Sequence, residues 1–162
     1  MEKNKSLKKE QKISNSFSLQ LKASGKAKEI EITNESNINE VKAIGGHFKL
    51  NDDVAYFFYS EAASFIAINI RASYKIENNF EKSKEEILKA VNKYNDYSFG
   101  IKATLSNFTH ESFDVELNVE SVVNSNSSGN LPIKPMLWLL GRSKNQIDTY
   151  FEAYFKTDKG EE

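Results

Sequence analysis

Residues 83–123 read SKEEILKAVNKYNDYSFGIKATLSNFTHESFDVELNVESVV, and this stretch decides the fold. Ser83 stands three residues before Glu86, which is the spacing of a capping box at the start of a helix. Apolar residues then recur at helical spacing, so the sequence predicts a capped helix over about residues 84–95. Its buried stripe is expected to consist of Ile87, Leu88, Val91 and Tyr94, with Glu85 and Lys89 pairing on the outside.

Two strands are predicted after this helix. FGIKATL, residues 99–105, and FDVELNV, residues 113–119, both alternate apolar and polar side chains, as a half-buried strand does. Residues 107–111 would form the loop of the hairpin that joins them. The stretch therefore predicts a local helix–strand–strand unit.

Strands are also predicted upstream of this unit. Residues 65–76 alternate over their whole length, with the even positions expected to face the core. The turn-forming run 51–53, Asn-Asp-Asp, separates two β-rich segments, residues 47–50 and 54–59, which predicts a hairpin. Because VAYFFY, residues 54–59, is apolar at every position, it is expected to be central or covered on both faces.

The first part of the chain gives less regular patterns. Residues 16–21 and 29–33 each alternate, which predicts two short strands with a turn at Gly25 between them. Residues 34–44 are ambiguous, because Ser36 could cap a short helix that Gly45-Gly46 would end.

A C-terminal amphipathic helix is predicted over about residues 132–155. Pro132 and Pro135 suit its first turn, and residues 141–143, Gly-Arg-Ser, would kink it or split it in two. Its apolar stripe is expected to include Ile133, Leu137, Leu140, Ile147, Phe151 and Tyr154. The predicted fold is α+β: a single-domain antiparallel sheet with the capped helix and this C-terminal helix packed on it.

Length and composition define the domain plan. The 162 residues suit one domain, expected over residues 13–155, between a disordered basic arm at 1–12 and a charged tail at 156–162. The run 124–130 is expected to be a mobile loop. The chain contains no cysteine, and no apolar run approaches a membrane span, so we expect a cytoplasmic protein that does not contact membranes. With a net charge of −1, nucleic-acid binding is not expected except through the basic arm.

The residues that could carry chemistry are better explained by structure. His47 and His110 are the only histidines and share no metal-ligand spacing, so structural or exposed positions are expected for them. Asp52-Asp53 is expected to form a turn. Asn92 and Asn95 could line a polar groove, but an exposed Asn92 and a capping Asn95 are favoured. We therefore expect a protein that is not an enzyme and that holds no cofactor or metal.

Aromatic residues near the C-terminus are the best candidates for binding. Trp138 lies off the apolar stripe and, with Tyr150 and Tyr154, could form an exposed patch of the kind found at interface hot spots. The alternative, slightly favoured, is that Trp138 packs under the Ser-rich loop at 124–130. Tyr94 is the fourth candidate for protein binding.

The segment VNKYN and the strand that follows it resemble the YbjN family of bacterial proteins, whose fold is similar to that of type III secretion chaperones. The residues that carry this resemblance are Val91, Asn92, Tyr94, Asn95, Phe99 and Ala103, within about residues 46–155. Tyr94 stands where the family usually has tryptophan, and residues 13–33 have no counterpart. The resemblance implies a non-catalytic, protein-binding or chaperone-like module, often a dimer, without a cofactor.

These observations lead to one functional hypothesis and one alternative. The first is a chaperone-like or adaptor-like module that binds another protein, with homodimerisation possible. The alternative is a small protein from a mobile element that binds and modulates a host enzyme or defence complex, because the chain is short, lysine- and asparagine-rich and charged at both ends. A ligand-binding enzyme is the least favoured class.

Overall fold

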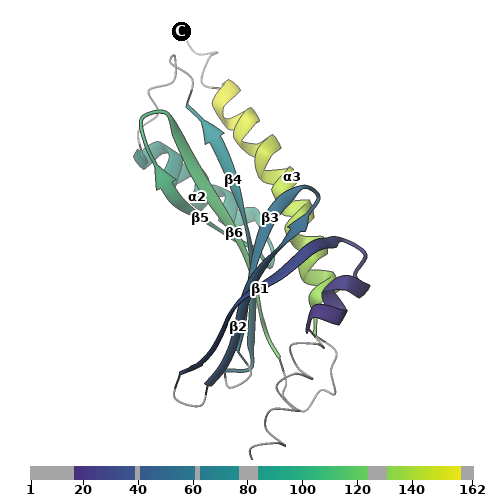
Figure 1. Cartoon of the computed structure of the whole chain (residues 1–162). Coiled ribbons are helices and arrows are strands. Elements are labelled where there is room, and N and C mark those ends of the chain that lie inside the picture. The colour runs from purple at the N-terminus through teal and green to yellow at the C-terminus, as the bar shows by residue number, and fades with distance from the viewer. Residues whose placement is uncertain (1–16, 39–40, 61–62, 77–83, 124–130, 158–162) are drawn as a thin grey trace, which may run out of the picture. The chain divides into compact units, whose positions relative to one another are not determined.

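The computed structural model describes residues 17–38, 41–60, 63–76, 84–123 and 131–157 (Figure 1). The expected α+β class is confirmed, with six strands and two long helices. The elements in chain order are β1 Ala27–Ile38, β2 Val41–Leu50, β3 Asp53–Ser60, β4 Phe65–Lys75, α2 Lys84–Tyr97, β5 Lys102–Phe108, β6 Ser112–Val122 and α3 Ile133–Thr157. The predicted arm at 1–12, the loop at 124–130 and most of the tail at 156–162 lie outside the described residues.

The six strands form one antiparallel sheet in the order β1-β2-β3-β4-β6-β5. The expected strands at 65–76 and 113–119 correspond to β4 and β6, which are neighbours in this sheet. At opposite ends of this pair, Ile76 N donates to Glu111 O at 2.7 Å and Val123 N donates to Ser64 O at 2.6 Å. The two internal strands with the clearest alternation therefore lie side by side.

The chain divides into two compact units. The first comprises Met1–Ile68 and Ser121–Leu137, and the second comprises Asn69–Glu120 and Trp138–Glu162. The single domain expected over residues 13–155 stays a prediction.

In the first unit, residues 17–23 are helical, so the strand predicted at 16–21 is wrong. Phe17 and Leu21 are buried, whereas Leu19 between them is 63% exposed. Two buried positions four residues apart share one helix face, which explains the pattern as well as a strand would. Phe17 packs against Phe57 of β3, with ring centroids 4.6 Å apart. The helix therefore covers the buried face of β3.

The ambiguous segment 34–44 belongs to two strands, so the short helix considered there is wrong. Its residues complete β1 and begin β2, and Ile38 pairs with Val41 across the hairpin. Gly45 and Gly46, interpreted as a helix stop, lie inside β2 instead. A β-carbon on Gly46 would lie against the Glu31 carbonyl oxygen and 2.7 Å from Phe57 Cζ. Gly46 is therefore required by the close packing of β1 and Phe57 against β2.

The predicted hairpin between β2 and β3 is confirmed, with a tighter turn than expected. Asn51 and Asp52 have φ values of 51° and 73°, the left-handed pair that a two-residue primed turn requires. β3 is internal to the sheet, as expected of a central strand. Coverage on both faces is wrong, because alternate side chains of β3 are exposed by 42–48%. These exposed side chains are Val54, Tyr56 and Phe58.

In the second unit, α2 begins at Lys84, directly after the predicted cap Ser83, which is outside the described residues. The predicted pair of Glu85 and Lys89 is present, with Oε1 and Nζ 3.1 Å apart. Leu88 is 38% exposed, so its place in the buried stripe was wrong. Ile87 lies near the centre of the buried face, and Leu88 is rotated from it by about 100°, the turn of one helical residue. The buried residues of α2 are Ile87, Ala90, Val91 and Tyr94.

The side chain of Asn95 joins the end of α2 to strand β5. Its Nδ2 donates to Ala103 O at 2.9 Å, and its Oδ1 accepts from Ala103 N at 2.8 Å. Ala103 pairs with Leu117 on β6 on its other side. The amide of Asn95 thus takes the place that a neighbouring strand would have beside β5. The expectation that Asn95 assists the helix cap is replaced by this contact, while Asn92 is exposed as expected.

Two other boundaries in the second unit differ from the predicted ones. β5 begins at Lys102, and Phe99, predicted as the first inward residue of this strand, is 93% exposed. Gly100 has a φ of 74°, which turns the chain between α2 and β5. α3 continues without a break through residues 141–143, so the split considered there is wrong.

Substituting Gly46 by alanine is expected to destabilise the protein. The new methyl group would meet a backbone oxygen and a buried ring, and overpacking of this kind costs about 1–3 kcal/mol. Gly45→Ala is the matched control, because a β-carbon there lies no closer than 3.7 Å to another atom. Urea unfolding of both variants measures the difference. Equal stability of the two variants would contradict the packing described for Gly46.

Substituting Asn95 by alanine is expected to lower the free energy of unfolding by about 1–3 kcal/mol, because it leaves the Ala103 backbone groups without this partner. Asn92→Ala changes the same residue type at an exposed position of the same helix, and a change within about 0.5 kcal/mol is expected there. Urea unfolding monitored by circular dichroism compares the two. A smaller loss for Asn95→Ala than for Asn92→Ala would exclude the strand-like role of Asn95.

Candidate functional site: the surface of helices α2 and α3

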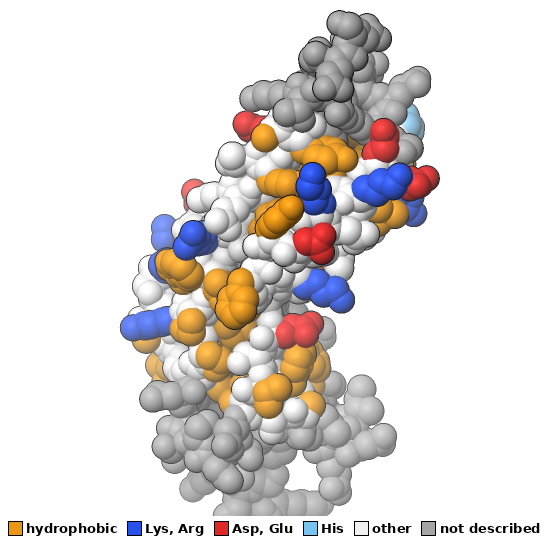
Figure 2. All heavy atoms as spheres, turned by 180° about the vertical axis from the view of Figure 1, so that it is seen from behind, with side chains coloured by type: hydrophobic (Ala, Val, Ile, Leu, Met, Phe, Trp, Pro, Cys, Tyr) orange, Lys and Arg blue, Asp and Glu red, His pale blue; other side chains and the backbone are white. Residues whose placement is uncertain are grey.

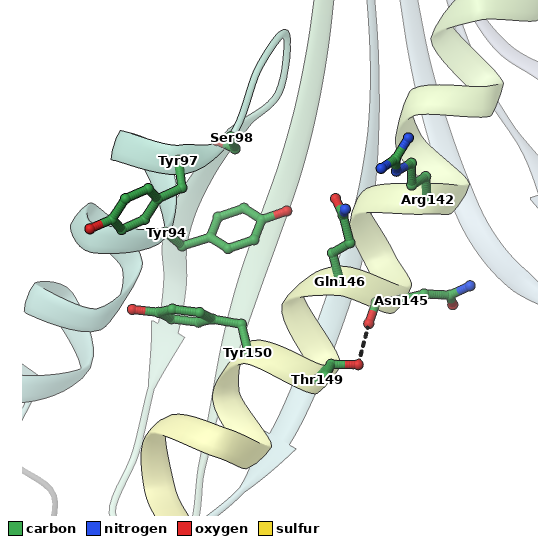
Figure 3. Close-up of a pocket in the computed structure, with 8 residues that line it drawn as sticks. All are labelled: Tyr94, Tyr97, Ser98, Arg142, Asn145, Gln146, Thr149 and Tyr150. Carbon is green, nitrogen blue, oxygen red and sulfur yellow. Dashed lines mark hydrogen bonds between the residues drawn. The ribbon is translucent and has the colours of Figure 1, made fainter. Parts of the chain in front are cut away.

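A pocket of about 490 Å³ lies in the second unit between α2 and α3 (Figure 3). Its volume falls in the range of about 300–1,000 Å³ that is usual for ligand sites. The lining residues come from the C-terminal end of α2, from Ser98 directly after it, and from about two and a half turns of α3. They are Tyr94, Tyr97, Ser98, Arg142, Asn145, Gln146, Thr149 and Tyr150. We refer to these residues, together with Trp138 and Tyr154, as the α2–α3 surface.

Tyrosine rings form one side of this surface. Tyr94 and Tyr150 face one another from the two helices with ring centroids 5.7 Å apart, and Tyr154 stacks on Tyr150 at 6.0 Å. Tyr97 extends the group outward and is 79% exposed. Figure 3 shows Tyr94 and Tyr97 projecting from α2 and Tyr150 projecting from α3 toward them. The four tyrosines, of which Tyr94, Tyr150 and Tyr154 are in ring contact, form an aromatic wall that α2 and α3 hold in place.

The hydroxyl groups of this wall differ in their surroundings. Tyr94 donates to the Ser143 carbonyl oxygen at 3.4 Å, and burial raises the pKa of Tyr94. Burial also raises the pKa of Tyr150, with smaller contributions from Tyr154, Tyr97 and Asp96. The Tyr150 hydroxyl oxygen is buried and has no hydrogen-bond partner among the residues that the structure describes. The raised pKa values keep Tyr94 and Tyr150 uncharged at neutral pH.

Polar groups form the other side of the pocket, and Arg142 is its positive charge. The Arg142 guanidinium lies 5.3 Å from the centre of the Trp138 ring, a distance typical of a cation–π contact. Trp138 is 51% exposed, and the Ser-rich loop at 124–130, under which it could pack, lies outside the described residues. Within the described parts of the chain, no acidic side chain pairs with Arg142. Gln146 lies beside Arg142 in Figure 3, whereas the Asn145 side chain points away from the tyrosines.

Beneath this surface, Asp148 fixes α3 to β4. One carboxylate oxygen accepts from the Tyr74 hydroxyl at 2.8 Å, and the other accepts from Lys144 Nζ at 2.8 Å. Tyr74 is also packed between rings, with centroids 5.0 Å from Phe113 and 5.0 Å from Phe151. Because these contacts lie on the inner side of α3, they hold the helix while its outer residues remain available.

The histidines are not part of this surface. His47 Nε2 lies 3.3 Å from Glu31 Oε2 on the sheet, and His110 is 90% exposed with Nε2 3.4 Å from Glu111 Oε1. Neither lines the pocket. Among the described residues, no three His, Asp or Glu side chains are grouped as metal ligands would be.

Three of the four residues predicted for protein binding come together. Tyr94 and Tyr150 line the pocket and Tyr154 stacks on Tyr150, while Trp138 reaches the same surface only through Arg142. Tyr97 and the polar lining residues were not singled out from the sequence. The sequence did contain a signal for the residues on α3, because residues spaced three and four apart lie on one face of a helix, and here that face points outward. The residues on that face are Trp138, Arg142, Asn145, Gln146 and Thr149.

In comparisons with known proteins, no protein-family model, no curated protein and no solved structure matches this chain. The resemblance to the YbjN family therefore stays a prediction. In the described part of the chain, no helix combines the length and hydrophobicity that a membrane-spanning helix needs.

Removing the Tyr74 hydroxyl is expected to reduce the amount by which the free energy of unfolding falls at high pH. Burial, followed by the hydrogen bond to Asp148, raises the Tyr74 pKa, so the folded chain keeps this proton where the unfolded chain releases it. The stabilisation is fully present below the ordinary tyrosine pKa of about 10 and is lost above it, by at most about 1.4 kcal/mol per pH unit.

Urea unfolding at pH 8 and at several values above pH 10 measures this effect in the wild type and in Tyr74→Phe. The variant should be less stable at pH 8, by about 1 kcal/mol for one lost hydrogen bond, and should lose less on going to high pH. An identical pH-dependent loss in both proteins would show that Tyr74 does not cause it.

Proposed function

We propose that this protein is a non-catalytic recognition module, chaperone-like or adaptor-like, that binds another protein through its α2–α3 surface. The observation that carries the proposal is the exposure of Tyr97 and Trp138 beside a pocket lined by two further tyrosines and an arginine. Tyrosine, tryptophan and arginine are the residue types enriched at interface hot spots. In this proposal the module works in the cytoplasm, with which a chain free of cysteine is compatible.

The rigidity of the supporting elements favours recognition by a preformed surface. Asn95 attaches α2 to β5, and Asp148 attaches α3 to β4, so the tyrosine wall stands on two anchored helices. Aromatic side chains with few rotatable bonds lose little entropy on binding when their backbone is already ordered. A partner would therefore meet Tyr94 and Tyr150 in nearly their bound arrangement.

The mixture of side chains also fits a partner that binds and dissociates. Figure 2 shows one face of the molecule, on which hydrophobic side chains form several small groups between charged ones. Interfaces of non-obligate complexes have this mixed composition, with aromatic residues at their centre and polar groups around them. The pocket repeats it locally, with tyrosines next to an arginine and two carboxamides.

Truncating Tyr97 is expected to abolish partner binding without unfolding the chain, because its side chain is 79% exposed. The tagged chain, its Tyr97→Ala variant and its Tyr56→Ala variant would be expressed in the native host, and co-purifying proteins quantified by mass spectrometry. A partner recovered with the wild type should fall by about tenfold or more with Tyr97→Ala, as for a hot-spot residue.

Tyr56→Ala is the matched control, because it removes the same side chain from an exposed position on β3 in the other unit. It should retain the partner. Retention by Tyr97→Ala together with loss by Tyr56→Ala would reject the α2–α3 surface and place binding on the exposed face of β3. Light scattering of the purified chain would identify the partner as a second copy if the wild type is dimeric and Tyr97→Ala is monomeric.

A further inference from the structure

Arg142 has the surroundings of a group that receives a negative charge. Its guanidinium is held over Trp138 at 5.3 Å and lines the pocket. The neighbouring cation on the same helix, Lys144, is already engaged by Asp148. Arginine presents several donors in a planar fork that matches a carboxylate, and stacking on an aromatic ring leaves the edge of that fork accessible. The pocket thus has one uncommitted cation, within the residues described, at its polar side.

Gln146 supplies groups that suit a polypeptide backbone. A carboxamide carries a donor and an acceptor side by side, as does a residue in an extended chain. The same chain shows this pairing at Asn95, whose amide binds both the N–H and the carbonyl of Ala103. Gln146 is exposed on the pocket, and its amide lies in Figure 3 between the tyrosines and Arg142. An extended peptide could therefore use it in the same way.

The aromatic side of the pocket disfavours a polyanion such as a nucleic acid. Asp96 is exposed and directly precedes Tyr97 in α2, so an acidic side chain lies at the helix end that carries two tyrosines of the wall. A ligand with regularly repeated negative charges would be repelled there while it is attracted at Arg142. A ligand with a single acidic group beside an uncharged bulky one avoids this conflict.

Building on the proposed function, we propose that the α2–α3 pocket binds an extended segment of the partner protein that carries a bulky apolar or aromatic side chain next to an acidic one. The apolar side chain lies against Tyr94, Tyr97 and Tyr150. The acidic side chain pairs with Arg142, and the backbone between them pairs with Gln146.

The test is a titration of the full-length ¹⁵N-labelled chain, followed by NMR, with acetyl-Ala-Phe-Glu-Ala-amide and its Phe-Gln counterpart. Both peptides should shift the resonances of pocket residues, and the Glu peptide should bind about threefold to fivefold more tightly, as expected for a partly exposed ion pair. In Arg142→Gln the two affinities should become equal. Lys102→Gln is the control and should keep the preference for the Glu peptide. Lys102 is exposed, and because adjacent residues of a strand point to opposite faces, its side chain points away from the face on which Ala103 is buried.

Several results would overturn this inference. They are equal affinity of the two peptides for the wild type, a Glu preference that survives in Arg142→Gln, absence of peptide-induced shifts at the pocket, and binding of an oligothymidylate there in place of the peptides. These outcomes are separate from those of the proposed function. Recovery of a native partner that is lost with Tyr97→Ala but unaffected by Arg142→Gln would uphold protein recognition at this surface while rejecting the acidic group.

Discussion

The structure of the second unit depends on the paired hydrogen bonds between the Asn95 side chain and the Ala103 backbone. A helix that lies beside a sheet is usually held by apolar contacts, which allow small shifts along the helix axis. Two directional bonds to a single residue fix the end of α2 relative to β5 instead. Since Tyr94 and Tyr97 flank Asn95 in the sequence, their positions on the α2–α3 surface follow from this contact.

One face of helix α3 packs in the core, and the opposite face lies at the surface. Its inner side contributes buried residues and the Asp148 link to Tyr74, while its outer side presents Arg142 and its neighbours. The exposed residues on the outer side of α3, such as Arg142 and Asn145, are therefore expected to contribute little to the stability of the fold. Such a separation lets the outer side chains change without loss of the helix, and it makes substitutions there informative about binding.

The sequence predicted the strands whose alternation is long and the helix whose start is capped. In β4 and β6, four successive alternate residues face inward. Helical spacing does not explain so long an alternation. Residues 17–21 offer only three apolar points, which a strand and a helix explain equally well. Residues 34–44 depend on pairing between β1 and β2, and on the lack of a side chain at Gly46, neither of which is a local signal.

The candidate site was predictable only in part for a related reason. Trp138, Tyr150 and Tyr154 could be recognised on one helix, but the pocket exists because Tyr94 and Tyr97 of α2 lie opposite them. The pairing of two helices that are distant in the sequence is a tertiary property. Asn95, which fixes the end of α2 against β5, was noticed in the sequence but interpreted as a helix cap. Its partner Ala103 lies beyond a turn whose geometry depends on Gly100.

The strand-like amide of Asn95 also has a consequence for self-association. An edge strand with bare N–H and carbonyl groups can recruit another strand and start aggregation. β5 is such an edge, and at Ala103 its outward groups are already occupied. The opposite edge, β1, is interrupted by register shifts between Lys28 and Glu31 and between Ile32 and Asn34. Neither border of the sheet therefore offers a further strand an uninterrupted row of backbone groups: β5 is interrupted by the Asn95 side chain, and β1 by its irregular backbone.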